Sequence, residues 1–131
     1  MTPVLSLVVY MAIVTFVALL AASLIRTKGW TPPGLKLAMG NRDNLPPADA
    51  LAGRAERAAR NTMEAFVLFA VIAIVAQIAG VKSPNLLLGA EIFFWSRLVY
   101  LAVYYAGIPM LRTAVWGVGI IGLAMMVVAI L

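Results

Sequence analysis

Four apolar stretches, each long enough to cross a bilayer as a helix, occupy most of this chain and limit what it can fold into. A membrane-spanning helix needs roughly 20 mainly apolar residues, and 64% of the 131 residues here are hydrophobic. The sequence therefore predicts an all-α integral membrane protein, a single transmembrane domain over residues 1–131 built as a four-helix bundle. The predicted spans are about 4–25, 57–79, 85–106 and 110–131.

Proline, glycine and capping residues mark the boundaries between the spans. Residues 27–53 contain two Pro-Pro pairs and several glycines, which predict an ordered or semi-ordered loop rather than a helix. Asp49 is a candidate N-cap for the helix that follows. Ser83 and Pro84 have the residue types that begin a helix. Gly107 ends the third span only a few residues before the fourth, so these two spans must be antiparallel neighbours.

The cations gather at one predicted membrane surface. Lys82 is the only cation in a loop at the other surface, and Arg97 lies within a span. Because cytoplasmic loops carry an excess of Lys and Arg, both termini are expected outside the cytoplasm. These cations flank spans and do not form a solvated patch with interleaved aromatic residues, so nucleic-acid binding is not expected. The cations assigned to the cytoplasmic surface are Arg26, Lys28, Lys36, Arg42, Arg54, Arg57, Arg60 and Arg112.

The chain contains no cysteine and no histidine. Disulfides, Ser-His and Cys-His catalytic pairs and nearly every kind of zinc site are therefore excluded. Arg, Tyr, Glu, Asp, Lys, Ser and Thr remain for any chemistry, and no metal is expected. If a thiol takes part in a reaction, it must arrive with a ligand.

Two polar stripes, one on the second span and one on the third, are spaced so that each lies on a single helix face. Their members recur at intervals of three and four residues, the spacing of neighbours on a helix surface. Such residues are costly in lipid and mark candidate functional sites. The first stripe contains Arg57, Asn61 and Glu64 and is bordered by Arg60; the second contains Arg97, Tyr100 and Tyr104.

Depth along the two antiparallel spans indicates which members of the stripes meet. Counted at about 1.5 Å per residue from membrane entry near residue 56 and exit near residue 107, Glu64 lies about 12 Å deep and Arg97 about 15 Å deep. Asn61 and Tyr104 both lie roughly 5 to 8 Å deep. We therefore expect a polar pocket open to the cytoplasm, with an ion pair of Glu64 and Arg97 as its floor. That pair could instead be structural and only fix the register of the helices.

Arg112 falls in the first turn of the fourth span, at the same surface as this pocket. The N-terminus of a helix contributes partial positive charge and free N–H groups, and the guanidinium adds a full charge. A thiol beside a helix N-terminus and a cation can have its pKa lowered from about 8.5 to between roughly 3.5 and 7.5. The role of Arg112 would be electrostatic, because arginine cannot act as a base.

The run from Arg57 to Glu64, Arg-Ala-Ala-Arg-Asn-Thr-Met-Glu, precedes an aromatic-rich apolar span. It resembles the signature of the superfamily of membrane-associated proteins in eicosanoid and glutathione metabolism, known as MAPEG. Four spans in a chain of this length also match that superfamily, as does Arg97-x-x-Tyr100-x-x-x-Tyr104 with an arginine after it. The resemblance covers essentially the whole chain, and the loop of residues 27–53 is similar to a bacterial branch.

The resemblance implies a homotrimer of four-helix protomers, with glutathione bound between neighbouring subunits near the cytoplasmic face. It also implies a bacterial inner membrane. Arg112 matches the arginine that stabilises the glutathione thiolate and is the candidate catalytic residue. Arg97, from the predicted pocket floor, is a further candidate binding residue. The glutathione-binding set implied by position is Arg57, Arg60, Asn61, Glu64, Tyr100 and Tyr104.

Three hypotheses of function follow. The first is a glutathione-dependent transferase or peroxidase, with glutathione as co-substrate and a lipophilic electrophile that partitions from the membrane lipids. The second is a non-catalytic small-molecule-binding or scaffold protein of the same fold. The third is a small multidrug transporter, which needs an acidic residue accessible from alternating sides. The arginines around Glu64 favour anions over cations and argue against the third hypothesis.

Overall fold

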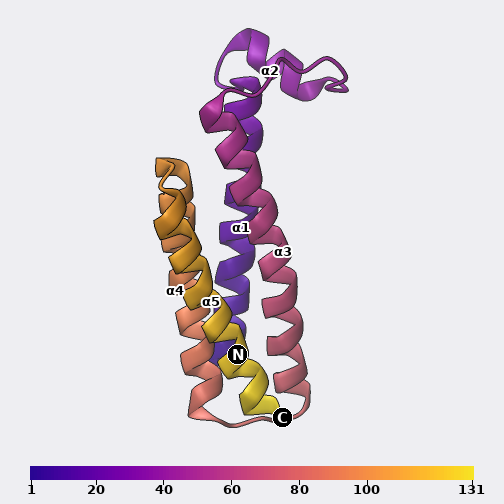
Figure 1. Cartoon of the computed structure of the whole chain (residues 1–131). Coiled ribbons are helices and arrows are strands. Elements are labelled where there is room, and N and C mark those ends of the chain that lie inside the picture. The colour runs from indigo at the N-terminus through magenta and orange to yellow at the C-terminus, as the bar shows by residue number, and fades with distance from the viewer.

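The computed structural model describes all 131 residues and contains helices only (Figure 1). Four of the helices are long and apolar enough to cross a membrane. The prediction of an all-α protein with four membrane spans is therefore confirmed. The helices are α1 (Pro3–Thr27), α2 (Pro32–Met39), α3 (Ala50–Ile78), α4 (Pro84–Ala106) and α5 (Pro109–Ile130).

Local sequence sets the ends of these helices. Thr2, Thr31, Asp49 and Ser83 each precede a helix, and each side chain accepts a hydrogen bond from a backbone N–H of its first turn. α4 ends at Gly107, whose φ of 77° lies in the left-handed region that glycine adopts without Cβ strain. The predicted helix starts at Asp49 and Ser83 and the predicted stop at Gly107 are confirmed.

The loop predicted over residues 27–53 is wrong at two places. Residues Pro32–Met39 form α2, because two prolines occupy the first helical positions, where no N–H donor is needed. Residues 50–53 are helical as well, because α3 already begins at Ala50, directly after the predicted N-cap. Asp49 caps the helix there, and the alanines and arginines that follow are good helix formers.

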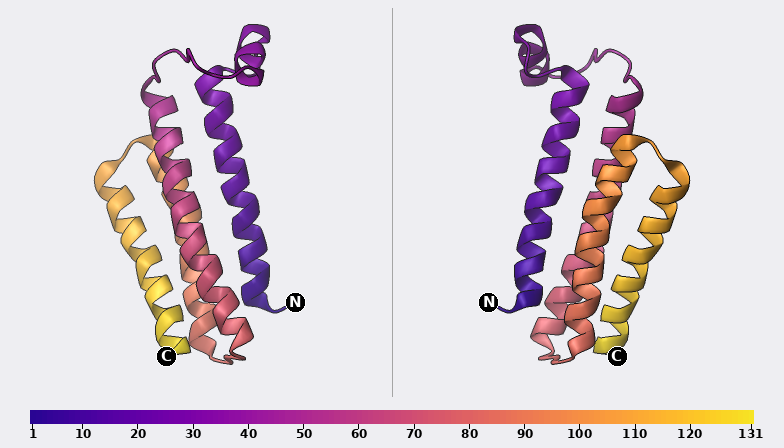
Figure 2. Two further views of the ribbon diagram at one scale, coloured as in Figure 1. Left: turned by 90° about the vertical axis from the view of Figure 1, so that its right-hand side faces the viewer. Right: turned by 90° about the vertical axis from the view of Figure 1, so that its left-hand side faces the viewer.

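The four long helices form two pairs. α1 packs along α3 and α4 packs along α5, and the pairs meet mainly where α4 contacts α3 and α1; α1 and α5 make no contact (Figures 1 and 2). Both termini lie at one end of the bundle, and α2 lies at the other end, where α1 and α3 extend beyond α4 and α5 (Figures 1 and 2). We call this second end, which carries Arg26, Arg54, Arg57 and Arg112, the arginine end.

The hydrophobic core holds α1, α3, α4 and α5 together in the half of the bundle away from the arginine end. The rings of Phe69 on α3 and Phe93 on α4 are buried and stacked, with centroids 4.5 Å apart. α4 and α5 approach each other closely at Gly89 and Gly122. A Cβ atom on Gly122 would lie 2.6 Å from the carbonyl oxygen of Gly89, so only glycine permits this contact.

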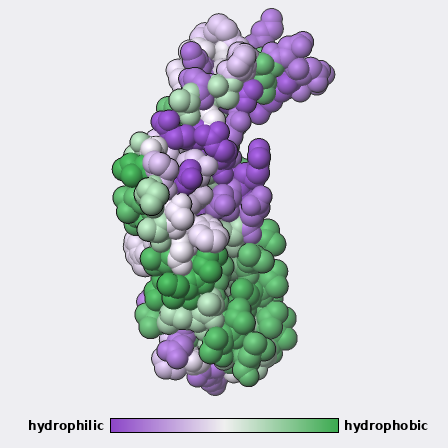
Figure 3. Space-filling model, viewed as in Figure 1, coloured by the Kyte–Doolittle hydropathy of each residue, from purple (hydrophilic) through white to green (hydrophobic).

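The surface divides along the length of the molecule. Hydrophilic residues cover the arginine end and α2, whereas the lower part of the face in Figure 3 is largely hydrophobic. Large apolar side chains are exposed on all four long helices, among them Phe16, Val71, Trp95 and Val128. A soluble monomer rarely exposes so much contiguous apolar surface, so this is the surface expected of a protein that contacts lipid or further subunits.

Candidate functional site

The deepest polar contact between α3 and α4 joins Arg97 to Asn61. Nη1 of Arg97 donates a hydrogen bond to Oδ1 of Asn61 over 2.8 Å. Arg97 is only 3% exposed, and its guanidinium carbon lies 4.2 Å from the centre of the Tyr100 ring. A buried charge needs hydrogen-bond partners, and an aromatic face adds a cation–π attraction. Asn61 and Tyr100 therefore form the environment that allows a charge at this depth.

The predicted ion pair between Glu64 and Arg97 is wrong. Glu64 has an exposed side chain, and the only ion pair within the chain joins Arg26 to Glu56. The side chain of Arg54 lies against Gly107 and so fixes the relative level of α3 and α4. At this level Glu64 and Arg97 lie at the same depth, and the pairing fails because the Glu64 side chain is exposed whereas Asn61 faces α4. The Cα atom of Asn61 lies about one helical turn, roughly 5 Å, nearer the arginine end than that of Arg97. The long arginine side chain spans that difference by extending towards the polar end of the bundle.

A second polar layer lies nearer the arginine end, around Tyr104. Nε of Arg57 donates a hydrogen bond to the Tyr104 hydroxyl over 3.2 Å, where Asn61 had been expected at this level. The guanidinium carbon of Arg112 lies 4.7 Å from the centre of the Tyr104 ring. The rings of Tyr104 and Tyr100 meet edge to face, with centroids 5.5 Å apart. Tyr104 thus connects arginines from α3 and α5 to the deeper layer.

These groups surround a pocket of about 260 Å³ between α3, α4 and α5. It contains members of both predicted polar stripes together with Arg112. Two lining residues, Thr113 and Trp116, were not among the predicted site residues. Trp116 follows Arg112 by four positions, which places both on one face of α5 and is the spacing signal that would have identified it. The lining residues are Asn61, Tyr100, Tyr104, Arg112, Thr113 and Trp116.

The N-terminus of α5 adds to the positive character of this pocket. Ile108 precedes the helix and provides no capping hydrogen bond, whereas each of the other four helices has a capping side chain. The first N–H groups of α5, beyond Pro109, therefore lack a side-chain partner. Together with the helix dipole and the nearby Arg112 guanidinium, they favour an anion at this end of the pocket.

Four of the predicted site residues do not line the pocket, and one of them, Arg97, lies in the deeper polar layer. Arg60 and Glu64 are exposed on α3 and do not line it within one chain. Arg57 is exposed at its rim, where the bond to Tyr104 holds the guanidinium. No carboxylate lines the pocket, and no group of three or more His, Cys, Asp or Glu side chains is arranged to hold a metal ion. The site within one chain is therefore arginine-rich and free of acidic groups.

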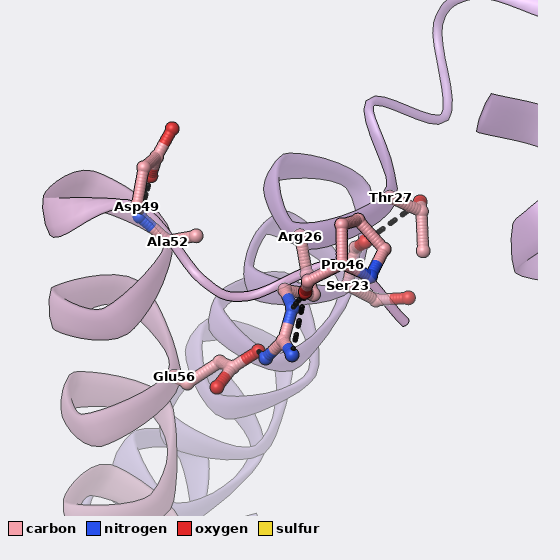
Figure 4. A network of polar contacts seen from close by, with 7 residues as sticks. All are labelled: Ser23, Arg26, Thr27, Pro46, Asp49, Ala52 and Glu56. Atoms are coloured by element: carbon pink, nitrogen blue, oxygen red, sulfur yellow. Dashed lines mark hydrogen bonds and ion pairs between the residues drawn. The ribbon is translucent and has the colours of Figure 1, made fainter. Parts of the chain in front are cut away.

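A separate network fixes the start of α3, from which the arginines project. Nη1 of Arg26 on α1 donates to Oε1 of Glu56 over 2.6 Å, and Nε and Nη2 donate to the carbonyl oxygen of Pro46 over 3.2 and 3.0 Å (Figure 4). The side chain of Asp49 caps α3 directly after this contact (Figure 4). Arg26 thereby ties the loop and α3 to α1 and positions the turn that carries Arg57.

The fold and the pocket define an integral membrane protein with four spans and an arginine-rich site at one end of the bundle. The model of the MAPEG family matches residues 3–131, and the chain therefore belongs to the MAPEG family. No curated protein and no solved structure matches it. At the level of the family, membership supports a membrane function of the glutathione-related transferase or peroxidase kind, or a related one.

Replacing Asn61 tests the deeper polar layer. In Asn61→Ala, the buried Arg97 guanidinium loses its acceptor, so the free energy of unfolding should fall by about 1–3 kcal/mol. Lys36→Ala is the control, because Lys36 is exposed on α2, outside the membrane spans, and forms no ion pair; its effect should stay within about 0.5 kcal/mol. Denaturant titration in detergent micelles measures both values. Equal losses in the two variants would contradict the assigned role of Asn61.

Proposed function

We propose that this protein is a glutathione-dependent transferase or peroxidase that acts on lipophilic electrophiles from the bilayer. The observation that carries the proposal is the placement of Arg112. Its guanidinium lies over Tyr104 at the uncapped start of α5 and lines a pocket that contains no carboxylate. This is an environment in which an anionic sulfur is favoured over a neutral thiol.

The chemistry needs no further base within the chain. The glutathione thiol loses its proton to solvent, and the thiolate is stabilised by Arg112 and the N-terminus of α5. The thiolate then attacks the electrophile, forming a bond to sulfur as the leaving group departs. Arg57 and Arg60 offer charge-assisted hydrogen bonds to the two carboxylates of glutathione. The apolar ring of Trp116 provides a surface for the second substrate.

A homotrimer is part of this proposal, because one face of α3 contacts no other helix of its own chain. This exposed stripe has charged residues in its first part and apolar residues in the rest. Its members follow each other at intervals of four and three residues, the spacing that packs one helix along another. Glu64 has no partner in its own chain, and an unpaired carboxylate in a membrane span is costly. In a trimer this stripe would meet neighbouring copies and bring Arg60 and Glu64 towards a shared site. The exposed stripe consists of Arg60, Glu64, Val67, Val71, Ile74 and Ile78.

The proposed orientation places the pocket on the cytoplasmic side of a bacterial inner membrane. The arginine end carries nearly all the cations, and the opposite end carries Lys82 alone, which is the charge asymmetry expected of a cytoplasmic face. Both termini lie at the opposite end (Figure 1). Both would then be outside the cytoplasm, and cytosolic glutathione would reach the pocket directly.

A non-catalytic protein that binds the same anionic thiol is the second candidate. The observation in its favour is that Arg112 and the uncapped start of α5 stabilise a bound anion whether or not it goes on to react. Binding of glutathione without turnover of any model electrophile would support it. A cation exporter is disfavoured, because the pocket is lined by Arg112 and by no carboxylate, whereas such a transporter needs an accessible carboxylate.

Thiolate formation can be measured through the ultraviolet absorbance of bound glutathione at neutral pH. The wild-type protein should hold glutathione mainly as thiolate, and in Arg112→Ala this signal should fall towards the few per cent expected of an unperturbed thiol. Lys82→Ala, which changes a cation at the opposite end, should behave as wild type. Absence of a thiolate signal in the wild-type protein would refute the catalytic proposal.

The trimer is tested with a bulky substitution in the exposed stripe of α3. Val71→Trp should reduce the fraction of protein with the mass of three chains, because the larger ring prevents close packing between copies. Val128→Trp on α5 is a matched control, since Val128 is 75% exposed and lies outside the stripe. Sedimentation in detergent gives the masses. A wild-type mass of one chain, or a Val71→Trp protein that remains trimeric, would contradict the proposal.

A further inference from the structure

A second hollow lies on another side of α4 and has no part in the thiol site. It is a groove of about 410 Å³ between α1 and α4, lined by five side chains of α1 between Ile13 and Ala21 and by Leu98, Leu101 and Tyr105 of α4. All eight lining residues are hydrophobic. We call it the α1–α4 groove. α5, which carries Arg112, does not touch α1, so the groove and the thiol site are separate.

The sequence of α4 explains how one helix serves both surfaces. Each of the three groove residues on α4 directly follows a residue of the polar stripe on the same helix. Leu98 follows Arg97, Leu101 follows Tyr100, and Tyr105 follows Tyr104. One position turns a helix by about 100°. α4 therefore presents a polar stripe towards α3 and α5 and an apolar stripe towards α1.

The dimensions of the groove fit an acyl chain. Ile13 and Ala21 are separated by about 12 Å along α1, close to the roughly 15 Å that one leaflet of the hydrocarbon core contributes. The groove lies within two membrane spans, where lipid is the surrounding solvent. Its end nearest the arginine end is formed by Tyr105, an aromatic residue of the kind that favours the headgroup level.

A positive charge without an acidic partner lies directly beyond this end. Nε of Arg54 donates to the carbonyl oxygen of Tyr105 over 3.2 Å, and Arg54 forms no ion pair. Glu56, the carboxylate in the same turn of α3, is already paired with Arg26 at 2.6 Å, and Asp49 caps its own helix. The charge of Arg54 is thus available to an anion at headgroup depth.

We propose that the α1–α4 groove binds an anionic phospholipid, with one acyl chain along α1 and α4 and the phosphate at Arg54. The apolar side chains of the groove would contact the acyl chain, and the unpaired guanidinium of Arg54 would bind the negatively charged phosphate. This proposal is independent of the thiol chemistry, because neither Arg54 nor any groove residue lines the pocket at Arg112.

Native mass spectrometry of the detergent-purified protein tests this with phosphatidylglycerol and phosphatidylcholine that carry identical acyl chains. The wild-type protein should retain phosphatidylglycerol with a preference of about fivefold, the effect of one cation near a headgroup. In Arg54→Gln the preference should disappear while both lipids still bind. In Ala21→Phe, where the ring fills the groove, retention of both should fall together.

Ala124→Phe on α5 is the matched control and should retain lipid as wild type does, because Ala124 is exposed and lies outside the groove. If the phenylalanine ring of Ala21→Phe prevents folding, the smaller substitution Ala21→Leu is used to fill the groove instead. Unchanged phosphatidylglycerol retention after the groove is filled would overturn the proposal, as would an unchanged preference in Arg54→Gln. A lower oligomeric mass in Ala21→Phe would also overturn it, since a second copy would then occupy the groove.

Discussion

The hydrogen bond between Arg97 and Asn61 is the contact on which the polar half of this bundle depends. A buried guanidinium between membrane helices is stable only if its donors are satisfied, and Asn61 and the face of Tyr100 meet that requirement. Because these residues come from α3 and α4, the bond also fixes how the two helix pairs lie against each other. The buried charge of Arg97 thus sets the register of α3 against α4.

The site is built outward from that layer. Tyr104 lies one turn above Tyr100 on α4, and it contacts Arg57 from α3 and Arg112 from α5. The uncapped start of α5 adds partial positive charge at the same place. α3 and α5 therefore supply positive groups around one pocket, while Arg60 and Glu64 point out of the chain on α3. This division is what a site completed by a neighbouring copy requires, and it is the basis of the proposed trimer.

Sequence alone predicted the four spans, most helix ends and the residues of both polar stripes. These depend on local properties: apolar length, capping residues at Asp49 and Ser83, and the periodicity that places Arg97, Tyr100 and Tyr104 on one face. It failed where relative position mattered. The pairing of Glu64 with Arg97 was wrong, because a matching depth does not decide which way a side chain points: Glu64 is exposed, and Arg97 donates to Asn61 instead. Trp116 was missed as a lining residue, since aromatic residues at that depth commonly lie at the membrane interface.

Ligand-induced thermal stabilisation shows whether the pocket at Arg112 binds an anionic thiol. Binding to the native state raises apparent stability, by about 2.7 kcal/mol at a ligand concentration of one hundred times Kd. Glutathione should raise the melting temperature of the wild-type protein more than a thiol-free analogue does, and both shifts should shrink in Arg57→Ala. Equal shifts for both ligands in both proteins would contradict the account.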